Sequence, residues 1–108
     1  MKELFSVKGK VALVTGGSRG IGLMIAKGYI QSGAKVYISS RNSEACKEVQ
    51  ESLSKFGDCI SIPTDLSKEE GVLYLVKKLK QLESRLDILV NNAGKTWGAP
   101  LEEYPMDA

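Results

Sequence analysis

Apolar residues follow two different periods along the chain, and the two periods alternate. Residues 10–16 (KVALVTG) form a short apolar, β-branched run that stops at a glycine, which is typical of a strand buried on both faces. Beyond Gly20 the period becomes helical, and one face carries Ile21, Met24, Ile25, Gly28 and Tyr29. We expect that face to pack inward and Gly33 to end the helix as its C′ residue.

The same alternation continues to residue 90. Three further strands are predicted at residues 34–40 (AKVYISS), 59–63 (CISIP) and 86–90 (LDILV). Asn42 or Ser43 is expected to cap a second helix that Gly57 closes, and its inner side carries Cys46, Val49, Leu53 and Phe56. Ser67 and Glu70 form a capping-box pattern before a third helix, whose inner face carries Val72, Leu75, Val76, Leu79 and Leu82.

The order of elements is therefore β-α-β-α-β-α-β. Such alternation implies a parallel sheet with helices on both faces, joined by right-handed crossovers. We predict an α/β fold, namely the N-terminal half of a Rossmann-like doubly wound sheet. At 108 residues the chain is long enough for one domain, so residues 1–108 are assigned to a single unit.

Composition narrows the class of partner. The net charge is +2, from 15 basic and 13 acidic residues without a basic stripe, which argues against a nucleic-acid surface. We find no secretory signal and no apolar run of membrane-spanning length. Cys46 and Cys59 make neither a metal cluster nor a disulfide framework, and histidine is absent. We expect a cytoplasmic protein with reduced thiols, no metal and a small-molecule substrate.

The segment TGGSRGIG, residues 15–22, lies between the first strand and the first helix. Glycines there allow a sharp turn and close approach of a pyrophosphate, and a helix N-terminus offers free N–H groups. The spacing Gly16-xxx-Gly20-x-Gly22 differs from the G-x-G-x-x-G fingerprint and from the P-loop. We interpret it as a phosphate-binding turn, the alternative being an ordinary tight turn.

Three motifs together resemble the short-chain dehydrogenase/reductase family over essentially the whole chain. Its pattern T-G-x-x-x-G-x-G is met by Thr15, Gly16, Gly20 and Gly22, and N-N-A-G by Asn91, Asn92, Ala93 and Gly94. Asp65 and Leu66 fall where the family holds the adenine ring. Within the family the chain is most similar to 3-oxoacyl reductases. The resemblance implies hydride transfer between NADPH and a carbonyl or hydroxyl group, with a 3-oxoacyl thioester as substrate.

The end of the second strand indicates which nicotinamide cofactor is preferred. An acid at this place would bind the ribose 2′-OH and repel a 2′-phosphate, but residues 39–42 read Ser-Ser-Arg-Asn. Arg41 offers a planar fork for phosphate oxygens, and Arg19 could reach the same group. Both arginines favour NADP(H), as the resemblance also implies. The alternative for each is a solvated surface arginine.

The resemblance implies the remaining cofactor contacts. The glycine turn would supply phosphate contacts from Gly16, Gly17, Ser18, Arg19, Gly20, Ile21 and Gly22. Asp65 would accept a hydrogen bond from the adenine amino group, with the Leu66 N–H nearby, although Asp65 could instead cap the following helix. Beside the adenosine ribose we expect Asn92, Ala93 and Gly94, whereas Asn91 could instead tie neighbouring strands together.

Family members use a serine and a Tyr-x-x-x-Lys motif that follows N-N-A-G. The one such pair here, Tyr74 and Lys78, precedes that motif and is expected to face solvent, so we interpret it as coincidence. We therefore expect no catalytic residue in these 108 residues, low stability and no activity of the chain alone. Two alternatives to an enzyme's cofactor-binding part are a non-catalytic nucleotide-binding module and a scaffold. Full-length family members are commonly homo-oligomers.

Overall fold

A computed structural model describes residues 7–16 and 20–92 of the chain. The elements in chain order are β1 (Val11–Thr15), α1 (Gly20–Gln31), β2 (Lys35–Ser39), α2 (Ser43–Leu53), β3 (Cys59–Ser61), α3 (Glu69–Leu82) and β4 (Ile88–Asn91). Each predicted strand and helix is present. The predicted α/β fold class is confirmed.

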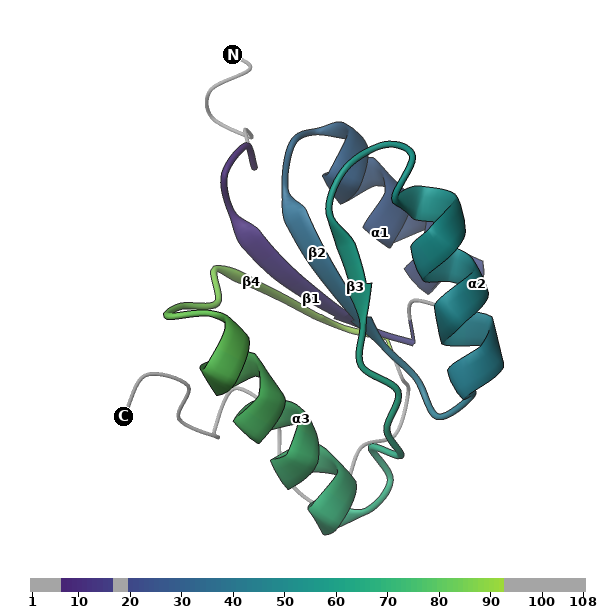
Figure 1. The fold of residues 1–108 in the computed structure, drawn as a ribbon, viewed down its shortest axis with the longest axis vertical. Helices are drawn as coiled ribbons and strands as arrows, with labels where there is room; N and C mark the ends of the chain where they lie inside the picture. Colours follow the sequence, from purple (N-terminus) through teal and green to yellow (C-terminus); the bar gives the residue numbers. More distant parts are fainter. Residues whose placement is uncertain (1–6, 17–19, 93–108) are drawn as a thin grey trace.

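The four strands form one parallel sheet in the order β3-β2-β1-β4 (Figure 1). β1 lies in the middle, where Val14 pairs with Ile38 of β2 on one side and Val90 of β4 on the other. β1 is buried along its whole length, as the continuous apolar run predicted. β4 forms one edge of the described sheet, and its apolar residues are only half-buried.

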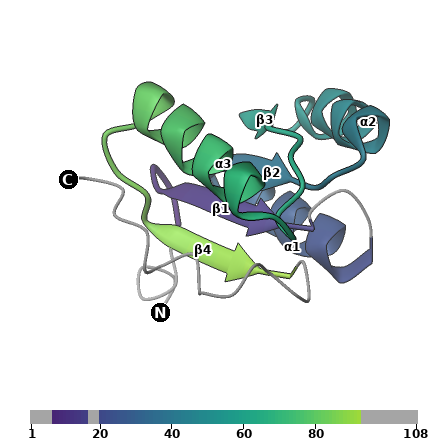
Figure 2. The same cartoon turned by 90° about the horizontal axis from the view of Figure 1, so that it is seen from below.

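Helices cover both faces of the sheet. α1 and α2 lie on one face and α3 on the other, as Figures 1 and 2 show from two directions. Alternate residues of β1 point to opposite faces of the sheet. Ala12 and Val14 pack in the core cluster that includes residues of α1 and α2. Val11 and Leu13 pack in the second cluster, with the inner face of α3. None of the helices among the described residues has the length and hydrophobicity of a membrane span.

The inward face of α1 differs from the predicted one. Its buried residues are Gly22, Ala26 and Ile30, whereas Ile21 and Met24 are 68% and 73% exposed and Gly28 is exposed as well. Ile25 and Tyr29 are only partly buried against the core. The small residues Gly22 and Ala26 allow α1 to lie close to the sheet, and this displaces the predicted face by about one position.

The C-terminus of α1 is as predicted. Gly33 has a φ of 98° and donates its N–H to the Ile30 carbonyl at 3.0 Å, while Ala34 donates to Tyr29 at 3.0 Å. These two bonds form a Schellman motif with Gly33 at C′. The left-handed conformation explains why glycine occupies this position.

The N-cap of α2 is Asn42, one of the two predicted residues, and its side chain accepts a hydrogen bond from the Ala45 N–H at 3.0 Å. Two other predictions for α2 need correction. The helix ends at Leu53, so Phe56 lies beyond it and is 48% exposed, with the Lys27 ammonium 5.3 Å from its ring centroid. Gly57 does not close the helix. A Cβ there would lie 2.9 Å from Ile30 Cγ2, so Gly57 allows two segments to pack closely.

The predicted capping box of α3 does not form. The N-cap is Lys68, without a side-chain hydrogen bond, and both Ser67 donors are directed to Asp65 instead. The inner face contains Val72, Leu75 and Leu79 as predicted, with Val76 half-buried. Leu82 was expected to face inward, but it lies in the last turn and is 53% exposed.

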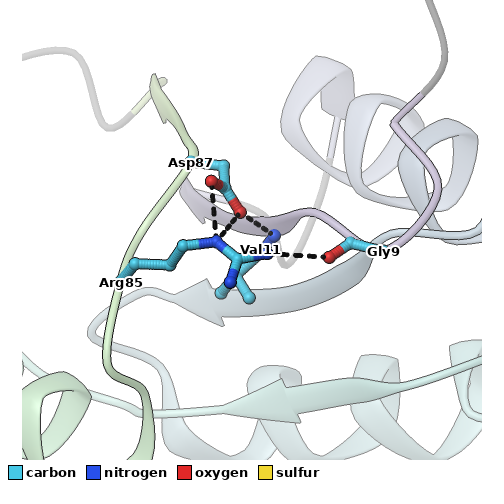
Figure 3. A network of polar contacts seen from close by, with 4 residues as sticks. All are labelled: Gly9, Val11, Arg85 and Asp87. Carbon is cyan, nitrogen blue, oxygen red and sulfur yellow. Dashed lines mark hydrogen bonds and ion pairs between the residues drawn. The ribbon is translucent and has the colours of Figure 1, made fainter.

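A carboxylate aligns the beginning of β4 with β1 (Figure 3). Asp87 Oδ2 accepts the Val11 N–H at 2.8 Å, and the Asp87 N–H donates to the Val11 carbonyl at 2.9 Å. Arg85 Nε lies 3.0 Å from Asp87 Oδ1, and Arg85 Nη2 donates to the Gly9 carbonyl at 3.4 Å. The Val11 N–H and the neighbouring Arg85 hold the pKa of Asp87 below its usual value.

Candidate cofactor-binding site

A cleft of about 800 Å³ lies where the sheet strands end. The segments that follow β1, β2, β3 and β4 all contribute to it. In a parallel sheet these carboxyl ends share one edge, which is where α/β proteins bind ligands. The described lining residues are Gly16, Gly20, Ile21, Ser39, Ser40, Arg41, Asn42, Ala45, Thr64, Asp65, Leu66, Ser67 and Asn92.

The glycine turn forms one wall of the cleft. Gly16 and Gly20 have φ values of 69° and 61°, a left-handed conformation that other residues rarely adopt. The Gly16 N–H donates to the Ser39 carbonyl at 2.7 Å, which holds the end of β1 beside the end of β2. α1 begins at Gly20, and Gly20 and Ile21 both line the cleft. The first turn of α1 therefore lies at the cleft, where its free N–H groups suit an anion.

Gly22 packs against the residues that form this wall, but it does not line the cleft itself. A Cβ on Gly22 would collide with the Gly16 carbonyl and lie 2.7 Å from Asn92 Nδ2. The lack of a side chain thus lets α1 contact both the turn after β1 and the segment after β4. Three other predicted residues of the turn, Gly17, Ser18 and Arg19, lie outside the described residues.

The end of β2 carries a cation and no acid. Ser39 is buried, and its hydroxyl donates a hydrogen bond to the Ile62 carbonyl at 2.8 Å, so its side chain links β2 to the segment after β3. Ser40 Oγ lies 3.1 Å from the sulfur of buried Cys46, which fixes the beginning of the turn. Arg41 is exposed and lines the cleft, as Asn42 does. The strand end that would carry an acid to bind a free ribose 2′-OH thus carries the guanidinium of Arg41 instead.

Asp65 and Leu66 lie in the segment after β3. Leu66 is buried in the core against α3, so its backbone is held at the cleft wall. Asp65 Oδ1 accepts two hydrogen bonds from Ser67, from the hydroxyl at 2.6 Å and from the N–H at 3.0 Å. These bonds, with smaller contributions from the charges of Arg41 and Lys68, lower the pKa of Asp65. Asp65 does not cap α3, since the N-cap is Lys68.

Asn92 follows β4 and lines the cleft near Gly22. Its N–H donates to Thr15 Oγ1 at 2.9 Å, and Thr15 Oγ1 lies 3.0 Å from Asn91 Oδ1. Asn91 therefore ties β4 to β1, which was one of its two expected roles. Ala93 and Gly94 lie outside the described residues.

The structure thus brings together seven of the predicted cofactor-binding residues in one cleft, namely Gly16, Gly20, Ile21, Arg41, Asp65, Leu66 and Asn92. Sequence reasoning missed six lining residues, namely Ser39, Ser40, Asn42, Ala45, Thr64 and Ser67. Only their position in the sequence could have indicated them, because each ends or follows a parallel strand or lies at the beginning of the next helix. Tyr74 and Lys78 are exposed on α3 and do not line the cleft.

Comparison with known proteins shows the family of the chain. The profile of the family described as short chain dehydrogenase matches residues 10–108. The chain belongs to this family. It is 56% identical over 106 residues to the rhamnolipids biosynthesis 3-oxoacyl-[acyl-carrier-protein] reductase of Pseudomonas aeruginosa, covering 98% of this chain and 41% of that protein. It is 41% identical over 103 residues to the gluconate 5-dehydrogenase of Gluconobacter oxydans, covering 94% and 40%.

Solved structures of family members share the fold. The Pseudomonas aeruginosa RhlG/NADP active-site complex matches with a TM-score of 0.83 and 55% identity, over 88% of this chain and 38% of that one. L-Sorbose reductase from Gluconobacter frateurii, solved with NADPH and L-sorbose, matches with a TM-score of 0.77 and 36% identity, over 91% and 38%. The chain therefore spans about two-fifths of the length of the relatives it matches.

Proposed function

We propose that residues 1–108 are the NADP(H)-binding part of a short-chain oxidoreductase, which transfers hydride between NADPH and a carbonyl or hydroxyl substrate. The observation that carries this proposal is that one cleft combines the start of α1, after the glycine turn, with Arg41 after β2, and has no acid at that strand end. A backbone anion site and a second, separate cation suit a dinucleotide with an additional 2′-phosphate.

The residues of the cleft fit such a cofactor. Gly22 keeps the first turn of α1 close to the end of β1, so that N–H groups rather than side chains would face the pyrophosphate. Arg41 would pair with the 2′-phosphate, and ionised Asp65 would accept from the adenine amino group. Asn92 would lie beside the adenosine ribose. The cofactor supplies the hydride, and these residues bind and orient it.

The substrate class is proposed from similarity. The relative that is 56% identical is described as a 3-oxoacyl-[acyl-carrier-protein] reductase, which favours a 3-oxoacyl thioester. We further propose that catalysis and assembly into a homo-oligomer belong to the full-length protein and that the 108 residues alone are inactive. A nucleotide-binding module without catalysis is a second candidate. It is favoured by the exposed position of Tyr74 and Lys78, outside the cleft.

Substitution of Arg41 tests the cofactor assignment. In the full-length protein, Arg41→Asp is expected to weaken NADPH binding by about 10- to 100-fold, because a charge-assisted contact to the 2′-phosphate is replaced by repulsion. NADH binding should be unchanged or tighter, because the new carboxylate can accept from the ribose 2′-OH. Fluorescence titration with both nucleotides measures the ratio of the two affinities.

The matched control is Lys47→Asp, which makes the same change of charge at an exposed position of α2 outside the cleft. It should leave the ratio of NADPH to NADH affinity unchanged. If Arg41→Asp and Lys47→Asp alter that ratio equally, or neither alters it, Arg41 does not select the 2′-phosphate.

A further inference from the structure

We propose that Ser67 is a positioning residue for the adenine end of the cleft, holding Asp65 so that its Oδ2 faces the amino group of a bound adenine. The inference rests on the proposed function, because it takes the ligand to be an adenine nucleotide. It gives a role at the site to a residue that the sequence pattern assigned only to helix capping. It also assigns the two oxygens of Asp65 to different tasks.

The two carboxylate oxygens of Asp65 have different surroundings. Oδ1 accepts the Ser67 hydroxyl at 2.6 Å and the Ser67 N–H at 3.0 Å. Within residues 7–16 and 20–92, no hydrogen bond to Oδ2 is observed. Since Asp65 and Ser67 both line the cleft, Oδ2 is the oxygen left to accept from a ligand. The pairing over two residues is the Asx-type turn that short polar side chains form.

The backbone under Asp65 is held by separate contacts. Leu66 is 5% exposed in the core beside α3. Thr64 Oγ1 donates to the Gly71 carbonyl at 3.0 Å, and a Cβ on Gly71 would collide with the Asp65 carbonyl. The turn is therefore packed against the beginning of α3. The freedom that remains to Asp65 is rotation of its side chain, and the two bonds from Ser67 restrict that rotation.

The ionised carboxylate can only accept hydrogen bonds, so it recognises a donor such as an exocyclic amino group. The charged groups that face Asp65 are Arg41, after β2, and Lys68, at the N-cap of α3. Ser67 makes the largest contribution to lowering the pKa of Asp65, and both cations act in the same direction. Ser67 thus favours the ionised, acceptor-only form of Asp65 and also orients it.

The test compares two probes that differ only in the amino group. They are adenosine 2′,5′-bisphosphate and the same nucleotide with purine in place of adenine, titrated by calorimetry into the full-length protein. The wild type is expected to bind the adenine probe about tenfold more tightly, as for one hydrogen bond to a charged acceptor. Ser67→Ala should reduce this preference to about threefold, while Ser67→Thr keeps the hydroxyl and should preserve it. The exposed α2 variant Ser52→Ala serves as the control.

Two further readouts separate positioning from a general loss of structure. The ratio of the two dissociation constants does not depend on the fraction of folded protein. In Asp65→Asn, the donors of Ser67 select the amide oxygen and turn the NH₂ group toward the cleft, so the adenine preference should disappear. In the wild type the preference is lost as pH falls through the pKa of Asp65, and Ser67→Ala should move this loss to higher pH.

The outcomes distinguish the two proposals. If the wild type binds neither probe, the proposed function fails and the inference fails with it. If the wild type prefers adenine but Ser67→Ala keeps both the full preference and the wild-type pH profile, only the role of Ser67 is overturned. An Asp65→Asn variant that still prefers adenine about tenfold also overturns that role.

Discussion

Gly22 shows how a single missing side chain shapes the site. A Cβ there would meet the Gly16 carbonyl and Asn92 Nδ2, so any larger residue must separate α1 from two walls of the cleft. We expect Gly22→Ala to cost about 1–3 kcal/mol of unfolding free energy through overpacking, and to weaken NADP(H) binding as well. Urea unfolding and nucleotide titration of the full-length protein measure the two effects.

Gly28 provides the matched control in the same helix. It is exposed, and a Cβ there would have no neighbour within 4 Å. Gly28→Ala should therefore stabilise the protein by about 0.5–1 kcal/mol, because alanine loses less conformational entropy in a helix than glycine does. Equal destabilisation by the two substitutions would show that close packing at Gly22 is not the reason for its glycine.

Arg41 and Asp65 could be predicted as site residues because each follows a strand, and the carboxyl ends of parallel strands meet at one edge of the sheet. The partner of Asp65 was not predictable in the same way. Ser67 and Glu70 match a capping box, but the Ser67 hydroxyl bonds to Asp65 and the N-cap is Lys68. Two local hydrogen-bonding patterns compete for one serine, and the sequence pattern does not show which one forms.

At the scale of elements, periodicity predicted where helices occur better than which face they bury. In α3, large apolar residues such as Leu75 and Leu79 form the contact, and the predicted face was largely right. In α1 the contact is made by Gly22, Ala26 and Ile30, and a hydrophobic pattern underweights the first two because they are small. The close approach of α1 to β1 explains the error, and it can be inferred only once both elements are placed.

One ionic cluster links β2 to the C-terminus of α3 and predicts a pH dependence. Glu83 Oε2 lies 2.6 Å from both Lys35 Nζ and the Tyr37 hydroxyl. Burial, followed by the hydrogen bond to Glu83, raises the pKa of Tyr37 from 10.0 to about 12. The folded state holds the phenol proton more tightly than the unfolded state does. The contribution of Tyr37 to the free energy of unfolding is therefore fully present below pH 10 and is lost as pH rises through about 12.

The Tyr37→Phe variant tests the origin of this alkaline loss. It should remove most of the decrease in unfolding free energy between pH 10 and 12, at some cost in stability at neutral pH from the lost hydrogen bond. The measurement is urea unfolding at a series of pH values. A wild-type decrease that Tyr37→Phe leaves unaltered would assign the alkaline effect to other groups.

For the whole molecule, alternation of strand and helix patterns was enough to predict a parallel sheet covered on both faces. The strand order β3-β2-β1-β4 is the order that a Rossmann-like sheet implies, although nothing local in residues 86–90 states which edge they join. The register at that edge depends on Asp87 and Val11, which are 76 residues apart in the sequence. Contacts of this range are not encoded in any short window of residues.

The 108-residue chain on its own exposes large apolar side chains on both helical layers. Met24 of α1 and Leu73 of α3 are 73% and 47% exposed, and β4 is an edge strand with half-buried apolar residues. We expect the purified 108-residue chain to aggregate or to melt broadly, since such surfaces and edges associate. Replacing both with Lys (Met24→Lys, Leu73→Lys) should reduce light scattering, and a sharp, reversible transition of the unaltered monomer would contradict the expectation.

The central place of β1 has a consequence during synthesis. One side of β1 can pair with β2 as soon as the first β-α-β unit has left the ribosome, but the other side must wait for β4. Until Asp87 reaches Val11, the nascent chain carries the most apolar strand of the sheet with one edge open. The closing step is a late, long-range event, which makes this interval the natural point for chaperone binding or for misassembly between neighbouring nascent chains.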